Sequence, residues 1–394
     1  MKLCIHRGTH QIGGVATEIS TSSTRILIDM GDELSLDPAF VSEPLNIPGV
    51  TDNNGSCDAV MFTHYHGDHT GQMLRIRSEI PIYAGALTKD ILHLSAEYGG
   101  VKNEELCRRI ETLHTFSPGQ TFLIGDIQIT PFCIDHSACD SYMFLIEADG
   151  KRLLYTGDFR LHGVRSKSMD KILDKLIRKV DVIVIEGTTV SRSHSDVIKE
   201  WDLQKQVKEY MRQYKYVFVL CATTNLDRIF MLAKAVPRGK YCICDNYQMS
   251  LVKTVFDHWS NISGFYEMPK LNTYGQNLLS RFQEFGGLMF VRANRKFENI
   301  ISQIDPEQSI LLYSMWDGYR TKPDSAIPDF LSLTGTWAHL HTSGHASPED
   351  LRHVIEKVNP EIVIPIHTDA PERMRTLCPN RKVILLKDRE ELSL

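Results

Sequence analysis

The sequence predicts a two-domain α/β protein, and three observations point to this fold class. The chain has 394 residues, enough for two hydrophobic cores. Short apolar runs that predict buried strands alternate with helix-like segments. Several of these runs end in a histidine or an acidic residue with glycine close by, so we expect the strand ends to gather polar side chains at one edge of the fold.

The first part of the chain predicts mostly strands, each recognised by its β-branched and aliphatic residues. Gly-Asp and Asp-Gly turns predict two hairpins. Two stretches without strand alternation, 86–98 and 102–113, predict helices. The expected strands are 2–6, 16–20, 24–31, 59–62, 81–84 and 182–189, and the hairpins span 122–132 and 142–155.

The pattern changes at residue 191. An amphipathic helix at 196–213, a strand at 216–221 and a helix at 226–236 begin a regular alternation of strands and helices that continues to residue 313. This βαβ rhythm predicts a second, smaller α/β domain with a parallel sheet. Further on, Ser347 and Pro348 predict the start of a helix that runs to about Val358 and leads into a strand at 362–366.

One short loop carries most of the chemistry. His64, His66, Asp68 and His69 place four potential ligands within six residues, directly after the apolar run 59–62. Histidines two residues apart lie on the same side of an extended segment. Imidazole suits zinc, and a carboxylate adds an oxygen ligand. The loop therefore predicts a site for two metals, and a polar loop with incidental histidines is the alternative.

Other candidate residues follow strand-like runs elsewhere in the chain. A single histidine is more often a packed core residue than a ligand, and a single aspartate before a turn is usually a cap. Their shared position after strands instead predicts that they meet at one site. These residues are Asp29, His136, Asp158, Glu186 and His367, with His345 in a Gly-containing loop.

Composition limits the cellular setting and the partners. The net charge of −5 is not that of a typical nucleic-acid-binding protein, although residues 191–335 carry +3 and the remainder −8. The odd number of cysteines, nine, argues against a complete disulfide framework. We find no transmembrane run of eighteen apolar residues and no signal-peptide core, so we expect a cytoplasmic protein with no membrane contact.

Taken together, these motifs resemble the β-CASP branch of the metallo-β-lactamase superfamily, and most of all its RNA-metabolising enzymes related to ribonuclease J. The resemblance implies an α/β fold, a metallo-β-lactamase αβ/βα sandwich with an inserted β-CASP domain. The sandwich would comprise residues 1–190 and 336–394, and the insert residues 191–335. The motifs that carry the resemblance are 8–14, 63–71, 156–158, 186–188, 341–345 and 365–367.

The resemblance also implies the metal ligands. His64, His66 and His136 would hold one zinc ion, and Asp68, His69 and His367 a second, with Asp158 bridging the two. The family uses two Zn²⁺ ions per chain to activate one hydroxide, and Mn²⁺ is an alternative. Asp29 would lie behind the histidine loop and orient a ligand imidazole.

Further roles are implied for residues around the metals. Asp68, Glu186 and His345 would be catalytic, with Glu186 orienting His345. A turn histidine and a plain helix cap are the alternative readings for His345 and for the Thr223 turn. The residues expected to bind substrate phosphate are Thr223, Thr224, Asn225, Ser343, Gly344 and His345. Each of five cations is expected to be a solvated surface charge, with contact to backbone phosphates as the alternative: Arg292, Arg295, Lys296, Arg320 and Lys322.

The function implied is a zinc-dependent phosphodiester hydrolase, a ribonuclease acting on single-stranded RNA, with DNA as a second possible substrate. Two other classes remain open: a hydrolase of a small thioester, lactone or cyclic phosphodiester, and a non-enzymatic nucleic-acid-binding subunit. Two departures narrow the resemblance. In the first, Thr368-Asp369 follows His367 in place of the more usual Gly-Glu. In the second, the stretch after His367 is short, so we expect no further C-terminal domain of the ribonuclease J type. A homodimer therefore remains only a possible expectation.

Overall fold

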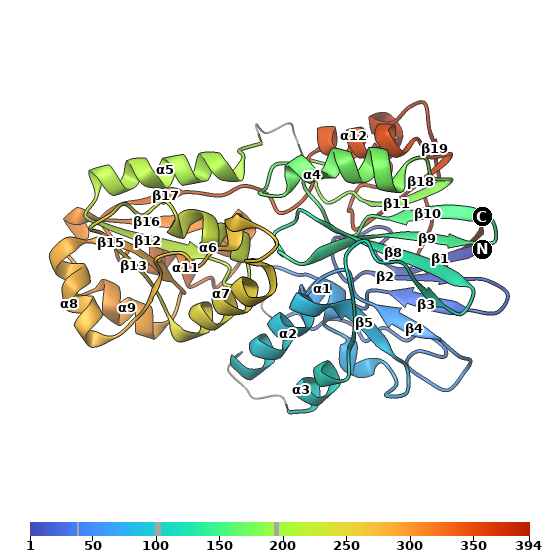
Figure 1. Cartoon of the computed structure of the whole chain (residues 1–394), viewed down its shortest axis with the longest axis horizontal. Helices are drawn as coiled ribbons and strands as arrows, with labels where there is room; N and C mark the ends of the chain where they lie inside the picture. The colour runs from blue at the N-terminus through green and yellow to red at the C-terminus, as the bar shows by residue number, and fades with distance from the viewer. Residues whose placement is uncertain (38, 99–103, 193–196) are drawn as a thin grey trace.

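Two mixed sheets face each other in the first part of the fold (Figure 1). The computed structural model describes residues 1–37, 39–98, 104–192 and 197–394. The first sheet has the strand order β20-β1-β2-β3-β4-β5-β6. Its strands are β1 (Lys2–Arg7), β2 (Ala16–Ser20), β3 (Arg25–Ile28), β4 (Ala59–Met61), β5 (Ile82–Gly85), β6 (His114–Phe116) and β20 (Glu391–Ser393).

The second sheet has the order β19-β18-β11-β10-β9-β8-β7. Its central strands β10, β11 and β18 run parallel, so their carboxyl ends lie at the same edge. These strands are β7 (Phe122–Ile124), β8 (Ile127–Ile134), β9 (Ser141–Ala148), β10 (Lys151–Tyr155), β11 (Val182–Glu186), β18 (Ile362–Ile366) and β19 (Lys382–Val383).

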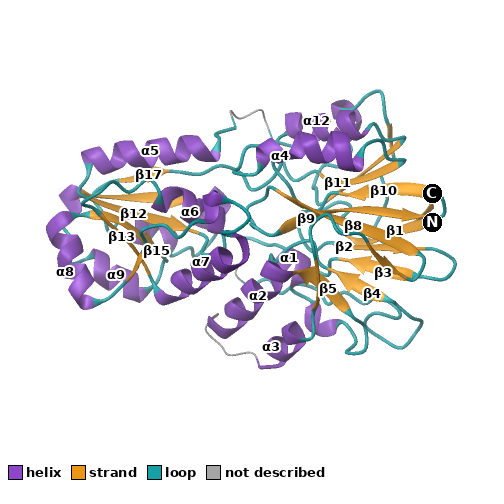
Figure 2. Cartoon of the chain, in the orientation of Figure 1, coloured by secondary structure: helices purple, strands orange, loops and turns teal. Residues whose placement is uncertain are grey.

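Helices cover the outer face of each sheet, as Figure 2 shows. Side chains such as Ile5, Phe144 and Val184 fill the space between the sheets. The alternate residues Leu145 and Ile183 pack under the helices of the second sheet, because successive strand residues point to opposite faces. The helical segments here are α1 (Gly67–Thr70), η1 (Met73–Arg75), α2 (Ala86–Tyr98), α3 (Glu104–Glu111), α4 (Ser166–Lys171), η2 (Ile172–Ile177), α12 (Pro348–Val358) and α13 (Arg373–Leu377).

A third sheet, all parallel, forms the insert, by which we mean α5 to β17. Its order is β14-β13-β15-β12-β16-β17, with helices on both faces. The strands are β12 (Tyr216–Cys221), β13 (Tyr241–Cys244), β14 (Asn272–Thr273), β15 (Gly287–Val291), β16 (Ser309–Ser314) and β17 (Trp337–His339). The helices are α5 (Glu200–Gln213), α6 (Leu226–Ala233), α7 (Asn246–Trp259), η3 (Gly264–Tyr266), α8 (Gln276–Phe285), α9 (Arg295–Ile301), η4 (Pro306–Gln308), α10 (Asp317–Thr321) and α11 (Ile327–Leu331).

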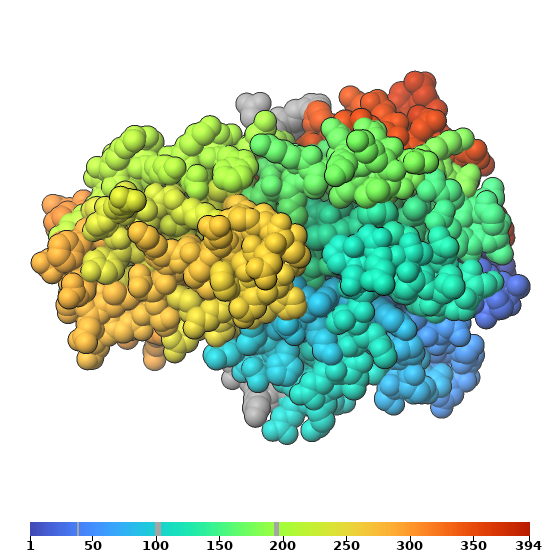
Figure 3. Space-filling model, in the orientation of Figure 1, coloured from blue at the N-terminus to red at the C-terminus, as the bar shows by residue number. Residues whose placement is uncertain are grey.

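The expected α/β sandwich with an α/β insert is confirmed, and Figure 3 shows the insert packed directly against the remainder. Part of each expected helix at 102–113 and 196–213 lies outside the described residues. β17 pairs with β16 of the insert, so we propose that the insert extends to His339, a few residues beyond the expected boundary at 335. Within the described ranges, the helices are too short or too polar to cross a membrane.

Candidate metal centre

The candidate ligands come together at one edge of the sandwich, because the strands that precede them end there. The histidine loop follows β4, Asp158 follows β10, and His367 follows β18. Asp29 and His367 adopt positive φ angles of 61° and 51°. Residues other than glycine seldom adopt this backbone conformation, and such strain concentrates at functional sites.

Hydrogen bonds fix the ring tautomers of the buried histidines. His136 Nδ1 lies 2.6 Å from the carbonyl oxygen of Gly344, which can only accept, so Nδ1 carries the proton. His69 Nδ1 likewise donates to Asp29 Oδ2 at 2.8 Å. The Thr188 hydroxyl donates to the backbone carbonyl oxygen of His367. The same hydroxyl therefore accepts from the Nδ1–H of the His367 imidazole, at 2.8 Å. The lone pair of each ring is therefore on Nε2, available to a metal.

The first group contains three imidazole nitrogens that face one another. His66 Nδ1 lies 3.0 Å from His64 Nε2 and 3.3 Å from His136 Nε2. Nitrogens bound to a tetrahedral zinc at roughly 2.0–2.1 Å are about 3.3 Å apart. These three side chains thus lie at distances that suit one zinc ion.

The second group combines two imidazoles and two carboxylates. Asp68 Oδ2 lies 3.1 Å from His367 Nε2 and 3.7 Å from His69 Nε2. Asp158 Oδ2 lies 3.1 Å from His69 Nε2 and 3.7 Å from His367 Nε2. Two negative and two lone-pair-bearing groups at these distances fit a second cation.

Asp158 joins the two groups through a single oxygen. Its Oδ2 atom also lies 3.8 Å from His136 Nε2 and 4.0 Å from His64 Nε2. We call the residues of both groups the metal groups: His64, His66, Asp68, His69, His136, Asp158 and His367. One carboxylate oxygen within reach of both sets is the arrangement that a bridging ligand requires.

The electrostatics keep these groups ready to bind metal. Burial, followed by the neighbouring imidazoles, lowers the pKa of His64 well below its ordinary value. Burial lowers the pKa of His66 to about 4. Burial alone would raise the pKa of Asp158, but the imidazoles of His367 and His69 hold it well below its usual range. His64 and His66 are thus neutral imidazoles and Asp158 is an ionised carboxylate, the forms that bind cations. For His69, burial would lower the pKa, but the carboxylates of Asp158 and Asp29 raise it well above its ordinary value.

His345 lies beside the metal groups. Its Nδ1 atom donates to Glu186 Oε2 at 3.0 Å and lies 3.7 Å from Asp158 Oδ2. Glu186 is itself fixed, since its Oε1 accepts from the backbone N–H of Phe159 at 2.8 Å. Burial would lower the pKa of His345, but the carboxylates of Glu186 and Asp158 raise it. The expected contact between Glu186 and His345 is confirmed.

The expected phosphate-binding residues lie in two loops next to this centre. Tyr65, between two candidate ligands, donates its hydroxyl to the carbonyl oxygen of Thr224 at 2.7 Å, which ties the turn before α6 to the histidine loop. Thr223 is partly exposed and Asn225 is buried at the N-cap of α6. In the second loop, Ser343 Oγ accepts from the backbone N–H of His345 at 3.1 Å.

In that same loop, Gly344 packs against His136. A Cβ atom built on Gly344 would lie 2.6 Å from Ser137 Oγ, so a larger residue would displace this loop. Two of the cations expected at the surface are paired: Arg292 contacts Asp245 Oδ2 at 2.6 Å, and Arg320 contacts Asp317 Oδ1 at 2.7 Å.

A second set of buried charges was missed at the sequence level. We call Asp135, Arg160, Glu200 and Arg228 the seam cluster. Arg160 Nε donates to Asp135 Oδ1 at 2.6 Å, and its Nη1 donates to Glu200 Oε1 at 2.8 Å. Arg228 Nη2 donates to the same Glu200 oxygen at 2.5 Å. The cluster therefore links the sandwich to α5 and α6 of the insert.

The seam cluster also supports the loop that carries His345. Arg160 Nη1 donates to the carbonyl oxygen of Ser343, and Arg228 Nη2 donates to that of Thr342, each at 3.2 Å. All four side chains are essentially buried. One indirect signal of the seam cluster was present in the sequence, because Arg160 stands two residues after Asp158.

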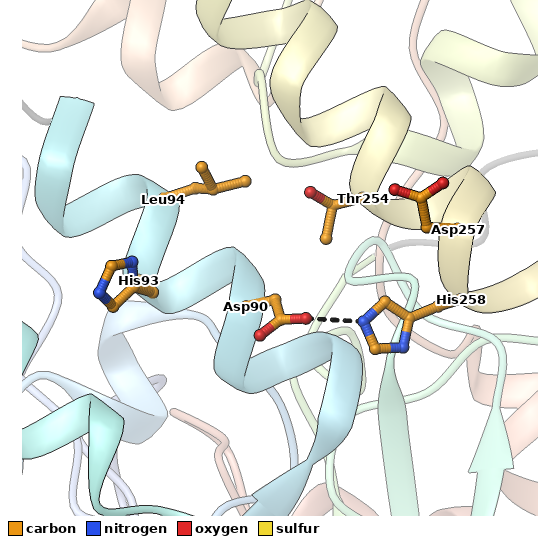
Figure 4. Close-up of a pocket in the computed structure, with 6 residues that line it drawn as sticks. All are labelled: Asp90, His93, Leu94, Thr254, Asp257 and His258. Carbon is orange, nitrogen blue, oxygen red and sulfur yellow. Dashed lines mark hydrogen bonds and ion pairs between the residues drawn. The ribbon is translucent and has the colours of Figure 1, made fainter.

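A separate groove lies between α2 of the sandwich and α7 of the insert (Figure 4). It has a volume of about 250 Å³ and is lined in part by Asp90, His93 and His258. His258 Nε2 and Asp90 Oδ2, 2.7 Å apart, join the two helices. None of the metal groups lines this groove, so it is not part of the candidate centre.

Comparison with known families supports this description. Residues 24–211 match the beta-lactamase superfamily domain, and residues 337–377 match the Zn-dependent metallo-hydrolase RNA specificity domain. A solved structure of a protein of unknown function from Enterococcus faecalis covers 100% of this chain and 99% of its own, with a TM-score of 0.80 and 20% identity. That likeness shows the same fold.

Several curated relatives are ribonucleases J. The protein from Mycoplasma genitalium is 21% identical over 95% of this chain and 69% of its own length. The Helicobacter pylori protein is 19% identical over 98% of this chain and 59% of its own length. An RNase J-like protein from Methanocaldococcus jannaschii is 30% identical over 47% of this chain, which spans 42% of that relative. The chain therefore carries a beta-lactamase superfamily domain followed by an RNA specificity domain, and it is similar to ribonucleases J over most of its length.

Proposed function

We propose that this protein is a zinc-dependent phosphodiester hydrolase that cleaves single-stranded RNA. The observation that carries the proposal is the position of Asp158 Oδ2, within 4.0 Å of imidazole nitrogens from both metal groups. The match of residues 337–377 to an RNA specificity domain supports RNA as the substrate. Two bound ions would act as Lewis acids on a phosphoryl oxygen and lower the pKa of an attacking water.

In this proposal the metal groups hold two zinc ions. His64, His66 and His136 would hold one ion, Asp68, His69 and His367 would hold the other, and Asp158 would reach both. Three nitrogens and an open position are typical of a catalytic zinc. The carboxylate-containing group also suits manganese, which prefers oxygen ligands.

His345 would act on the substrate itself. Its Nδ1–H is held by Glu186, so Nε2 is the atom left to meet a phosphoryl or leaving oxygen. The side chain is 23% exposed, so it is accessible to solvent and to a substrate. Because two carboxylates favour its charged form, the imidazolium can donate a proton to a leaving oxygen or stabilise developing negative charge. Glu186 is then a positioning residue.

Two loops would hold phosphates of the bound strand. Thr223, Thr224 and Asn225 precede α6, whose first backbone N–H groups and positive dipole end favour an anion. Ser343 and Gly344 form the loop that leads to His345. The first loop contacts Tyr65 of the histidine loop through Thr224, and the second contacts His136 through Gly344. Phosphates bound at either loop would therefore lie close to the metal groups.

The test is cleavage of 5′-labelled and 3′-labelled single-stranded RNA and DNA by the purified protein, with zinc content measured on the same samples. We expect wild type to cleave RNA and His345→Ala to lose about two orders of magnitude in rate while keeping its metal. His353→Ala, a histidine far along α12 that contacts Asp170, is the control and should match wild type. Full zinc loading without cleavage of any nucleic acid would contradict the proposal.

A further inference from the structure

Aromatic side chains gather on the insert where α10 meets β17. Trp316 is 43% exposed, Tyr319 46% and Trp337 41%. The Trp316 and Tyr319 rings pack edge to face with centroids 5.5 Å apart, and the Arg320 guanidinium lies 5.4 Å from the centre of the Trp337 ring. We call Trp316, Tyr319, Trp337 and His339 the aromatic patch. Such a concentration of exposed rings marks an interaction surface.

The rings of the patch are held in place although they are exposed. The Trp316 indole lies against Gly318, where a built Cβ atom would be only 2.3 Å from the ring. Asp317 accepts two hydrogen bonds from Arg320, at 2.7 and 2.9 Å, and lies 3.1 Å from His339 Nε2. These contacts connect α10 to β17, so the ring faces are ordered before any ligand binds. Less conformational entropy is then lost on binding.

The chain joins the patch to the loop that carries His345. Burial, and next the negative charge of Asp68, raise the pKa of Tyr319. The parallel strands of the insert end on the side of the sandwich, and Figure 1 shows the segment after β17 crossing from the insert to α12. His345 is part of that segment.

Along this segment, alternate side chains form a row of rings. The ring centroids of Trp337 and His339 are 6.5 Å apart, and those of His339 and His341 are also 6.5 Å apart. Trp337 and His339 are exposed, whereas His341 is partly buried and its Nδ1 atom lies 3.3 Å from Arg228 Nη1. Leu340 and Thr342, on the other side of the segment, are buried. Because residues two apart in an extended chain lie on one side, the row runs continuously from the patch toward His345.

We propose that the aromatic patch is a stacking subsite for unpaired bases of the nucleic-acid strand whose phosphate reaches the metal groups. The inference rests on the proposed function and names its substrate class: a single strand with accessible base faces. Every base can stack on an indole or phenol face, so such a subsite accepts many sequences but excludes a duplex, whose bases are already stacked. Continuity with the His345 segment favours a nucleic-acid strand over a second copy of the chain.

The test compares Trp337→Ala and Trp337→Phe with Trp201→Ala. Trp201, on α5, is equally exposed at 43% but lies outside the patch, so it is the matched control. Affinities are measured by fluorescence anisotropy with a labelled ten-nucleotide RNA, the same strand with abasic sites, and the matching duplex. A His345→Ala background slows hydrolysis during the measurement. Sedimentation velocity at the same protein concentration reports the oligomeric state.

We expect Trp337→Ala to weaken binding of the intact single strand about tenfold, Trp337→Phe to restore most of it, and Trp201→Ala to have no effect. The abasic strand should bind wild type and Trp337→Ala equally. Equal affinities of these two proteins for the intact strand would overturn the subsite, as would a loss identical for the abasic strand. A dimer that dissociates in Trp337→Ala, with RNA affinity unchanged, would identify the patch as a protein interface instead.

These outcomes are separable from those of the proposed function. Base-dependent binding without cleavage by the wild-type protein would leave the subsite standing and remove the ribonuclease proposal. Cleavage by the wild-type protein without base-dependent binding would leave the ribonuclease proposal standing and remove the subsite. The zinc content of Trp337→Ala should equal that of wild type, and a loss of zinc would show that the substitution disturbs the metal groups.

Discussion

Two buried sets of ionisable side chains lie only two residues apart in the chain, around Asp158 and around Arg160. In the seam cluster, arginine donors face carboxylate acceptors, and the charges are paired within the protein. In the metal groups, imidazole lone pairs and two carboxylates face one another. Four histidines there approach Asp158 Oδ2 within 4.0 Å, so the set is rich in acceptors.

The difference shows how a metal centre can be distinguished from a structural ion network. Both sets are buried, and both shift pKa values: Arg228 and Arg160 offset the burial of Glu200 and lower its pKa to about 2. What separates them is the matching of donors and acceptors. A buried set of acceptors without matching donors is costly unless a cation completes it. The predictions below test this contrast.

The largest expected effect is the loss of activity in Asp158→Asn. The amide keeps the size of the side chain but removes the negative charge that both metal groups share. Loss of an outer hydrogen-bond partner costs metal sites roughly 10–100-fold, and removal of a shared ligand should exceed that, so hydrolysis of bis(p-nitrophenyl) phosphate should fall to background. Asp324→Asn, in an exposed loop where φ is 55°, should behave as wild type.

Next in size is the loss of stability in Glu200→Ala. This change leaves Arg160 and Arg228 buried without their shared carboxylate, and breaking such a pair costs about 3–5 kcal/mol. The free energy of unfolding from urea titration measures it. Asp202→Ala, which removes an exposed partner of Lys205 on the same helix, should change stability by less than about 1 kcal/mol. Equal losses of stability in the two variants would contradict the conclusion that Glu200 pairs with buried arginines in the seam cluster.

The stabilisation by Glu200 should also depend on pH. Its pKa is lowered from 4.5 to about 2 in the folded protein, so the ionised side chain stabilises the fold above about pH 4.5, and this stabilisation is lost as the pH falls toward 2. The difference in unfolding free energy between wild type and Glu200→Gln should therefore shrink over that range. A difference that grows toward low pH would contradict the assignment.

Chelation should have a somewhat smaller effect, and only on the metal groups. A ligand present at 100 times its dissociation constant stabilises the folded state by about 2.7 kcal/mol. Treatment with a chelator should therefore lower the urea midpoint of wild type but not that of Asp158→Asn. A similar decrease in both proteins would show that the chelator acts elsewhere.

The smallest expected effect is that of Thr188→Val. This change removes the hydroxyl that accepts from His367 Nδ1 and frees the ring to change tautomer or rotate. The affinity for the second ion should fall about tenfold, measured by competition with a chromogenic chelator. Thr189→Val, whose hydroxyl contacts the carbonyl oxygen of Ala346, is the neighbouring control and should leave metal affinity unchanged.

The sequence predicted the metal groups because each ligand follows an apolar strand of ordinary length. A strand that ends at a sheet edge places the residue after it at that edge. Ligands that are far apart in the sequence can therefore meet there, so His64 and His367 could be grouped without knowing their contacts. Asp29, directly after β3, and Glu186, the last residue of β11, followed the same rule. The parallel insert was predicted from the alternation of strands and helices, whereas the sandwich was implied by the resemblance to the β-CASP enzymes.

The seam cluster could not be predicted in this way. Glu200 belongs to an amphipathic helix in which acidic residues normally face water, and its partners Arg160 and Arg228 lie 40 and 28 residues away. Only the packing of the insert against the sandwich buries it. Short elements such as α10 and β17 were missed because three to five residues are too few for hydrophobic periodicity to appear.

Back-titration of the metal-free protein with Zn²⁺ tests the central claim most directly. Zinc uptake is followed by isothermal titration calorimetry, with wild type and His136→Ala measured side by side. The account predicts two equivalents per wild-type chain and a weakened or lost first equivalent in His136→Ala, with the far-ultraviolet circular dichroism unchanged. Uptake of no zinc by folded wild type, or identical uptake by His136→Ala, would contradict the claim that metal ions complete this set of acceptors.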